Sequence, residues 1–212
     1  MSRDHDPPAA ENRFDARRLR PGAIRFHWRP GQSAEALVAR LERNGCWGQI
    51  VGPHGSGKSA LVAAMRDAIR RSGRNAVVIE LHDNRRRLPV RLHRMPDPGK
   101  GAVVIVDGYE QLGRWSRFSL RRFCRRRRLG LLVTAHASVG FPDLCRTSAG
   151  LDTAGDIVRD LLGDEARLIS DEEIAARFHR HEGDLREMLF SLYDWYEQRR
   201  RGSGDSSAGS GV

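Results

Sequence analysis

The chain has 212 residues and a mass of 23.9 kDa, the size of one domain with a small appendage. Its 37 basic side chains exceed 27 acidic ones, giving a net charge of +10, and all but Lys58 and Lys100 are arginine. The sequence contains no apolar run near the ~20 residues of a membrane helix, no secretory signal and no CxxC pair among its three cysteines. We therefore expect a reduced, cytoplasmic compartment, with no disulfide framework and no membrane contact.

The first third of the chain predicts a disordered arm, a helix, a strand and a second helix, in that order. Residues 1–12 are rich in Pro, Asp and Ala and show no periodicity, which is typical of disorder. A helix is predicted between the N-cap Ser33 and Gly45, because apolar residues recur there at helical spacing. The apolar run 46–51 predicts a strand, and a one-sided apolar stripe predicts a helix over 58–72.

Three further apolar runs indicate buried strands. They span residues 76–81, 102–106 and 129–135 and are rich in β-branched side chains. Runs that are apolar on both faces are typical of parallel strands covered by helices on both sides. The fold class expected is therefore α/β with a mostly parallel sheet.

The C-terminal third predicts helices only. Helices are expected over 156–162, after the capping box that begins at Ser170, and after a second cap at Asp184. Their apolar stripes predict a small helical lid over residues 151–200. Residues 201–212 are rich in Gly and Ser and predict a flexible tail, which leaves 13–150 as the α/β domain.

A phosphate-binding loop follows the first predicted strand. The octapeptide GPHGSGKS at residues 52–59 matches the P-loop pattern G-x-x-x-x-G-K-[ST] in full and opens a predicted helix, as the motif requires. The fold expected is therefore a three-layer P-loop NTPase sandwich. The residues expected to bind the nucleotide are Gly52, Pro53, His54, Gly55, Ser56, Gly57, Lys58, Ser59 and Ala60.

The chemistry of phosphate binding explains these residue types. Glycines let the backbone N–H groups converge on phosphate oxygens, and the helix N-terminus adds its positive dipole. Lys58 is expected to reach the β- and γ-phosphates of ATP. In a chain that uses arginine for nearly every cation, one of two lysines stands where a compact ammonium is needed.

A carboxylate opposite the loop completes a magnesium site. The run AVVIVD ends at Asp107, which is the pattern of a Walker B strand. The Ser59 hydroxyl is expected to ligate Mg²⁺, and Asp107 is expected to hold the ion through water from the opposite side. Many P-loop ATPases place a glutamate directly after this aspartate, but Gly108 stands there. Glu110 is the first candidate for the catalytic base and Glu80 the second.

The strand over 129–135 ends in polar residues. If this strand inserts between the first strand and the Walker B strand, Thr134 or His136 lies beside the γ-phosphate. Either side chain is then suited to orient the attacking water or to sense its loss. The alternative is a strand that simply turns polar as it leaves the sheet.

The segments GPHGSGKS, AVVIVDGYE, LLVTAH and EGDLRE occur in the order found in AAA+ ATPases, and the sequence resembles that family over residues 23–196. EGDLRE is similar to the sensor 2 motif of clamp-loader and replication-initiator relatives. The resemblance implies that Arg186 points from the lid helix toward the γ-phosphate. The chain departs from the family at Gly108, in a short Arg- and Pro-rich stretch over 82–101, and in offering no clear arginine finger.

Charge is distributed unevenly along the chain. Residues 85–128 carry 13 arginines and one lysine against three acids, whereas residues 151–198 carry 13 acids against five arginines. The basic segment predicts contact with nucleic acid, with an acidic protein or with the acidic lid of a second copy in a homo-oligomer. The alternative is a general bias toward arginine in this chain.

The leading functional prediction is a Mg²⁺-dependent ATPase of the AAA+ or a related class, which couples nucleotide state to partner contacts. A nucleotide or small-molecule kinase, and a nucleotide-dependent binding module with negligible hydrolysis, remain as alternatives. The sequence contains neither the N-K-x-D motif of GTPases nor an LSGGQ-like signature between the P-loop and Asp107.

Overall fold

The computed structural model describes residues 14, 24–81, 86–88 and 99–204. Five strands form one parallel sheet: β1 (Trp47–Val51), β2 (Ala76–Glu80), β3 (Val103–Asp107), β4 (Gly130–Ala135) and β5 (Asp143–Arg146). The strand order is β2-β3-β4-β1-β5, so β4 lies between β1 and β3 as the sequence analysis required. The chain is therefore an α/β protein, and the predicted fold class is confirmed.

The central strands form because their side chains are apolar on both faces. Val103 and Ile105 pack into one core, and the alternating Val104 and Val106 pack into another. Strand β5 was not predicted. It has only four residues, its sequence DLCR mixes polar and apolar side chains, and it lies at the sheet edge.

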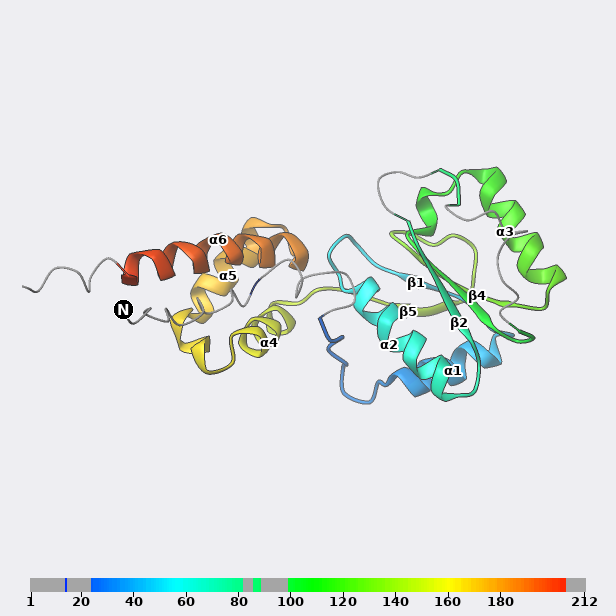
Figure 1. The fold of residues 1–212 in the computed structure, drawn as a ribbon, viewed down its shortest axis with the longest axis horizontal. Coiled ribbons are helices and arrows are strands. Elements are labelled where there is room, and N and C mark those ends of the chain that lie inside the picture. Colours follow the sequence, from blue (N-terminus) through cyan, green and yellow to red (C-terminus); the bar gives the residue numbers. More distant parts are fainter. Residues whose placement is uncertain (1–13, 15–23, 82–85, 89–98, 205–212) are drawn as a thin grey trace, which may run out of the picture.

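Helices cover both faces of the sheet (Figure 1). Helices α1 (Ala34–Arg43) and α2 (Lys58–Arg71) pack their apolar stripes on one face. Helix α3 (Arg114–Arg126) covers the other face and buries Leu120 and Cys124 against it. Ser33 caps α1 as predicted, accepting a hydrogen bond from the backbone N–H of Ala36.

The C-terminal third forms a separate helical lobe (Figure 1). It consists of α4 (Leu151–Leu162), a 3-10 turn over Gly163–Leu168, α5 (Asp171–Arg180) and α6 (Leu185–Gly204). Ser170 caps α5 as predicted, since its hydroxyl accepts a hydrogen bond from the backbone N–H of Glu173.

The structure differs from the predicted boundaries at two places. Phe14, which the sequence analysis assigned to the α/β domain, is fully buried in the helical lobe and packs edge-on against Tyr196. The predicted tail at 201–212 begins inside α6, because that helix runs on to Gly204. Residues 1–12 and 205–212, and most of the stretch 82–101, lie outside the described residues. None of the described helices combines the length and apolarity that crossing a lipid bilayer would demand.

Candidate functional site

The P-loop connects the end of β1 to the start of α2 and wraps around the side chain of Lys58. The Lys58 Nζ donates hydrogen bonds to the carbonyl oxygens of Gly52 at 2.8 Å and of Pro53 at 2.6 Å. Burial lowers the pKa of Lys58, and the nearby carboxylates of Glu110, Asp107 and Asp184 oppose that shift. The loop therefore holds a largely buried ammonium inside its turn.

Two glycines of the loop have no room for a side chain. A Cβ at Gly52 would lie 2.1 Å from the Thr147 Oγ1. Gly55 has a φ of +64°, and a Cβ there would lie 2.0 Å from the Asp184 Oδ1. The loop can therefore approach both β5 and the lid only because these positions are glycine.

Asp107 joins the P-loop to the neighbouring strand. Its Oδ2 accepts a hydrogen bond from the Ser59 hydroxyl at 2.6 Å, and its Oδ1 accepts one from the Thr134 hydroxyl at 2.5 Å. The Thr134 oxygen in turn accepts from the backbone N–H of Gly108 at 2.8 Å. Both carboxylate oxygens are thus fixed, and the hydroxyl of Thr134 already donates to Asp107.

Glu110 lies on a 3-10 turn, Tyr109–Gln111, that follows β3. Its Oε1 lies 3.4 Å from the Nε2 of His136 at the end of β4. Its other oxygen, Oε2, is buried and has no hydrogen-bond partner in the part of the chain described. Burying a carboxylate oxygen without a hydrogen-bond partner costs folding free energy. Here the oxygen belongs to a side chain that lines the cavity described below.

Arg117 of α3 holds this turn in place. Its Nη2 donates to the Glu110 carbonyl oxygen at 2.6 Å, and its Nε donates to the Leu112 carbonyl oxygen at 2.8 Å. Its guanidinium also lies 5.3 Å from the centre of the Tyr109 ring. The position of Glu110 therefore depends on Arg117, which lies on the next helix, α3.

The helical lobe, which the sequence predicted as a lid, contacts the P-loop directly. Asp184 caps α6, because its Oδ1 accepts from the backbone N–H groups of Arg186 and Glu187. Its Oδ2 lies 3.2 Å from the Nδ1 of His54 in the P-loop. The ring of His54 also lies 5.5 Å from that of His136, measured between centroids. One run of contacts thus extends from the lid across the P-loop to Glu110.

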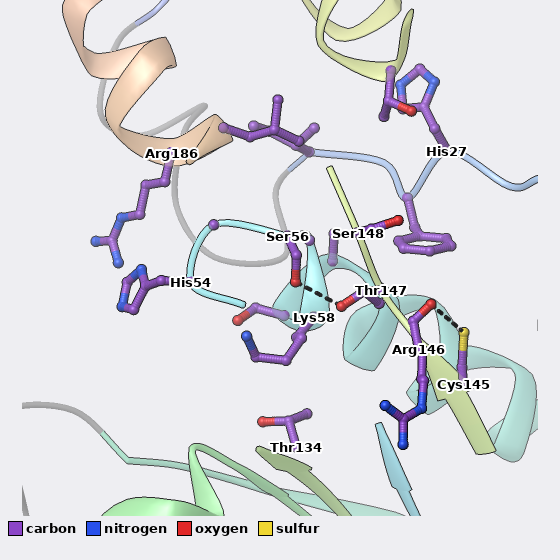
Figure 2. Close-up of a pocket in the computed structure, with 18 of the residues that line it drawn as sticks. His27, His54, Ser56, Lys58, Thr134, Cys145, Arg146, Thr147, Ser148 and Arg186 are labelled. Carbon is purple, nitrogen blue, oxygen red and sulfur yellow. Dashed lines mark hydrogen bonds between the residues drawn. The ribbon is translucent and has the colours of Figure 1, made fainter. Parts of the chain in front are cut away.

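A cavity of about 450 Å³ lies between the P-loop, the sheet and the lid. Figure 2 shows Lys58 and Thr134 facing this space, with His54 and Arg186 at one side. Its polar part is formed by the P-loop and Asp107, and its apolar part includes Ile24, Ile157 and Leu189. The cavity therefore combines a polar part beside the P-loop with an apolar part.

Most of the predicted site residues line this one cavity. They are His54, Gly55, Ser56, Gly57, Lys58, Ser59, Ala60, Asp107, Glu110, Thr134 and Arg186. Gly52 and Pro53 are not among the described residues that line it, but their carbonyl oxygens accept hydrogen bonds from Lys58, which does. Glu80, the second candidate base, pairs in register with Asp107 at the end of β2 but is not among the described residues that line the cavity.

Two parts of the site were not predicted from the sequence. Thr147, after the unpredicted strand β5, is buried and shares a 2.7 Å hydrogen bond with the P-loop hydroxyl of Ser56 (Figure 2). Ile24 and Phe26 line the cavity from a segment outside any helix or strand. The apolar residues in IRFHW before α1 were the available signal for that second part.

No family model matches the chain, and none of the curated proteins matches it. Among solved structures, NtrX from Brucella abortus in complex with ADP is similar, with a TM-score of 0.55 and 14% identity over 86% of this chain and 54% of that one. The chain thus spans about half the length of NtrX. A second NtrX structure has a TM-score of 0.48 at 13% identity, covering 82% of this chain and 51% of that one. PCH-2 from C. elegans has a TM-score of 0.39 at 16% identity, covering 63% and 46%.

The likeness to ADP-bound NtrX shows a shared fold. The two scores below 0.5 add nothing to that assignment. The chemistry of this chain has to be argued from its own residues.

Proposed function

We propose that this protein binds Mg-ATP in the cavity beneath the P-loop and hydrolyses it, as an ATPase of the AAA+ or a related class. The observation that carries the proposal is the contact between Ser59 and Asp107, which brings the end of the P-loop to the end of β3. Lys58 lies beside this pair, and all three line the cavity. The fold shared with ADP-bound NtrX supports the nucleotide, and the order of the sequence motifs supports the class.

The residues present fit a magnesium ion held partly by the nucleotide. Among the described residues no cluster of three or more His, Cys, Asp or Glu side chains is arranged for a metal. A hydroxyl and a carboxylate, Ser59 and Asp107, are instead placed together. Mg²⁺ prefers oxygen ligands and commonly takes one or two from protein and the rest from phosphates and water. When bound, it would neutralise charge on the phosphate oxygens.

The other side chains have roles that follow from their positions. Lys58 would exchange its loop carbonyls for phosphate oxygens, and the loop N–H groups would bind the same anion. Glu110 would accept a proton from the attacking water on its unpartnered Oε2, as the water oxygen bonds to the γ-phosphorus and ADP leaves. Thr134 would act on Asp107, which its hydroxyl already orients.

Arg186 would connect catalysis to the lid. It lines the cavity from the first turn of α6, and its guanidinium lies 5.7 Å from the centre of the Phe190 ring. Since Asp184 on the same turn contacts His54, a phosphate bound in the loop would change the surroundings of both lid residues. The position of the lid would then depend on whether a γ-phosphate is bound.

Phosphate release from Mg-ATP by the Lys58→Ala variant tests the proposal. Losing a charge-assisted contact costs about 1.5–3 kcal/mol, so we expect apparent ATP affinity to fall by about tenfold to 100-fold and release to fall with it. Lys100→Ala is the matched control, because Lys100 is the only other lysine and is exposed. Equal affinity in wild type and Lys58→Ala would sink the site assignment.

The same assay separates the two alternatives. A kinase would release little phosphate with water alone and would turn over only when an acceptor is added. A binding module would retain Lys58-dependent ATP binding and release no phosphate. Gly108, in the position where many relatives carry the catalytic glutamate, is the observation that favours the binding module.

A further inference from the structure

Two large aromatic side chains of α3 are open to solvent. Trp115 is 85% exposed and Phe118 is 61% exposed, the two highest values among large hydrophobic side chains in the described part of the chain. Residues three apart on a helix are neighbours on one face, so the two rings lie together. Neither ring contributes to the core beneath α3, which is built from Leu120 and Cys124.

The same face of α3 carries arginine. Arg122 follows Phe118 by four residues and Arg126 follows Arg122 by four, which continues the face along the helix. Both are exposed, and neither forms an ion pair with any described residue. The chain has no Asp or Glu from residue 111 to residue 142, so this helix supplies no counter-charge of its own.

The inward arginines of α3 are used differently. Arg117 bonds to the Glu110 turn, as described above, and Arg121 donates to the Tyr109 hydroxyl at 3.0 Å and to the Val139 carbonyl oxygen at 2.8 Å. A general bias toward arginine would explain why α3 contains many of them. It does not explain why Arg122 and Arg126 share a face with the two exposed aromatic rings.

We propose that the outer face of α3, formed by Trp115, Phe118, Arg122 and Arg126, is a binding surface for single-stranded nucleic acid. Aromatic faces stack on unpaired bases of any sequence, and guanidinium groups bind the phosphates between them. In a double helix the base faces are hidden in the stack, so exposed aromatic rings favour a single strand. Figure 1 shows α3 at the end of the α/β lobe away from α6, so a strand bound there lies clear of the lid.

The surface stands apart from the nucleotide site, because none of its four residues lines the cavity. Its connection to the cavity is through the helix itself, since Arg117 on the inner face holds the turn that carries Glu110. Binding to the outer face can therefore be measured without nucleotide. Any effect of the strand on turnover rests on the proposed ATPase function.

Fluorescence anisotropy of a labelled oligodeoxythymidine, titrated with the full chain in the absence of nucleotide, tests this surface. Each ring is expected to stack on one base, so Trp115→Ala with Phe118→Ala should weaken binding by at least about tenfold. Arg122→Gln with Arg126→Gln should reduce the slope of log affinity against log salt by about 1.4, the value for two phosphate contacts on a single strand. Duplex DNA should bind less tightly than the single strand.

The charge-matched control is Arg43→Gln with Arg70→Gln, two exposed arginines on α1 and α2. The control should bind like wild type. A control that weakens binding as much as the α3 variants would overturn the proposal, because net charge alone would then explain it. Absence of binding to any single strand by the wild type would also overturn it and would leave an acidic protein or a second copy of this chain as the candidate partner of this face.

The Lys58→Ala variant separates this proposal from the ATPase. If the oligonucleotide binds Lys58→Ala as it binds wild type, the α3 surface stands whatever becomes of the nucleotide site. If ATP binding survives Lys58→Ala while the α3 variants lose the oligonucleotide, the proposed function fails and this surface does not.

Discussion

The cleft around the P-loop and the outer face of α3 use their polar side chains in opposite ways. In the cleft, Lys58, Ser59 and Thr134 all donate hydrogen bonds within the chain, and Asp107 accepts on both oxygens. On α3, Arg122 and Arg126 have no ion pair with any described residue. Contacts within the chain therefore hold the polar side chains of the cleft in place, whereas no ion pair with a described residue holds these two arginines of α3.

This contrast bears on how the arginines of a basic chain are interpreted. The number of basic residues does not locate function here, because α3 contains both structural and unpaired arginines. The partners of each guanidinium distinguish the two groups. Two properties can be tested with variants: the hydrogen bonds that hold the polar side chains of the cleft, and the division of the α3 arginines into an inner and an outer group.

Glu110→Gln should produce the largest loss. If Oε2 accepts the proton of the attacking water, removing its charge should lower phosphate release by about 10²–10⁴-fold and leave ATP affinity unchanged. Steady-state release and equilibrium binding, measured on the same preparation, separate the two effects. Glu80→Gln is the control, and an equal loss in both variants would contradict the assignment of the base.

Thr134→Val should destabilise the fold around Asp107. The substitution removes the donor to the Asp107 Oδ1 and leaves the Gly108 N–H without its acceptor. Because Thr134 is fully buried, we expect the free energy of unfolding to fall by about 1–3 kcal/mol in a urea titration. Thr134→Ser, which keeps the hydroxyl, should recover part of this loss. Unchanged stability in the valine variant would mean that these bonds do not hold the carboxylate.

Arg117→Ala should lower phosphate release by about tenfold, because the variant loses two charged hydrogen bonds to the turn that carries Glu110. ATP affinity should stay unchanged, since Arg117 does not line the cavity. Arg114→Ala, on the exposed first turn of α3, is the matched control and should keep wild-type release. If both variants behave alike, the division of α3 into inner and outer arginines is wrong.

Cys124 should be the least reactive of the three thiols. Its side chain is fully buried between α3 and the sheet, and burial raises its pKa to about 12 from an ordinary value of 9.0. At pH 8, iodoacetamide should label Cys46 and leave Cys124 unlabelled in intact-mass spectra. Between pH 9 and 12 the unfolded chain releases a proton that the folded chain keeps, so this thiol makes stability fall as pH rises. Labelling of both cysteines at equal rates would show that α3 does not cover Cys124.

The P-loop, strand β3 and the core helices could be predicted from the sequence because their signals are local. GPHGSGKS is a complete motif, and the apolar runs that became β3 and β4 are buried on both faces. Even the capping residues Ser33 and Ser170 act within three residues of themselves.

The remaining parts depend on contacts between distant residues. Thr147 meets Ser56 across 91 positions, and Phe14 meets Tyr196 through the core of the helical lobe. The exposure of Trp115 and Phe118 could not be predicted from the sequence either, because an apolar residue on a helix is ordinarily assigned to the core. Pairing and exposure are properties of the folded chain.

Calorimetric titration of Mg-ATP into the Glu110→Gln variant tests the central claim most directly, because slow turnover leaves only the heat of binding. The predicted result is one nucleotide per chain in Glu110→Gln, and at least about a tenfold weaker affinity when Lys58→Ala is added to it. Absence of saturable binding in Glu110→Gln, or an affinity that Lys58→Ala does not change, would contradict the assignment of the cleft as an ATP site.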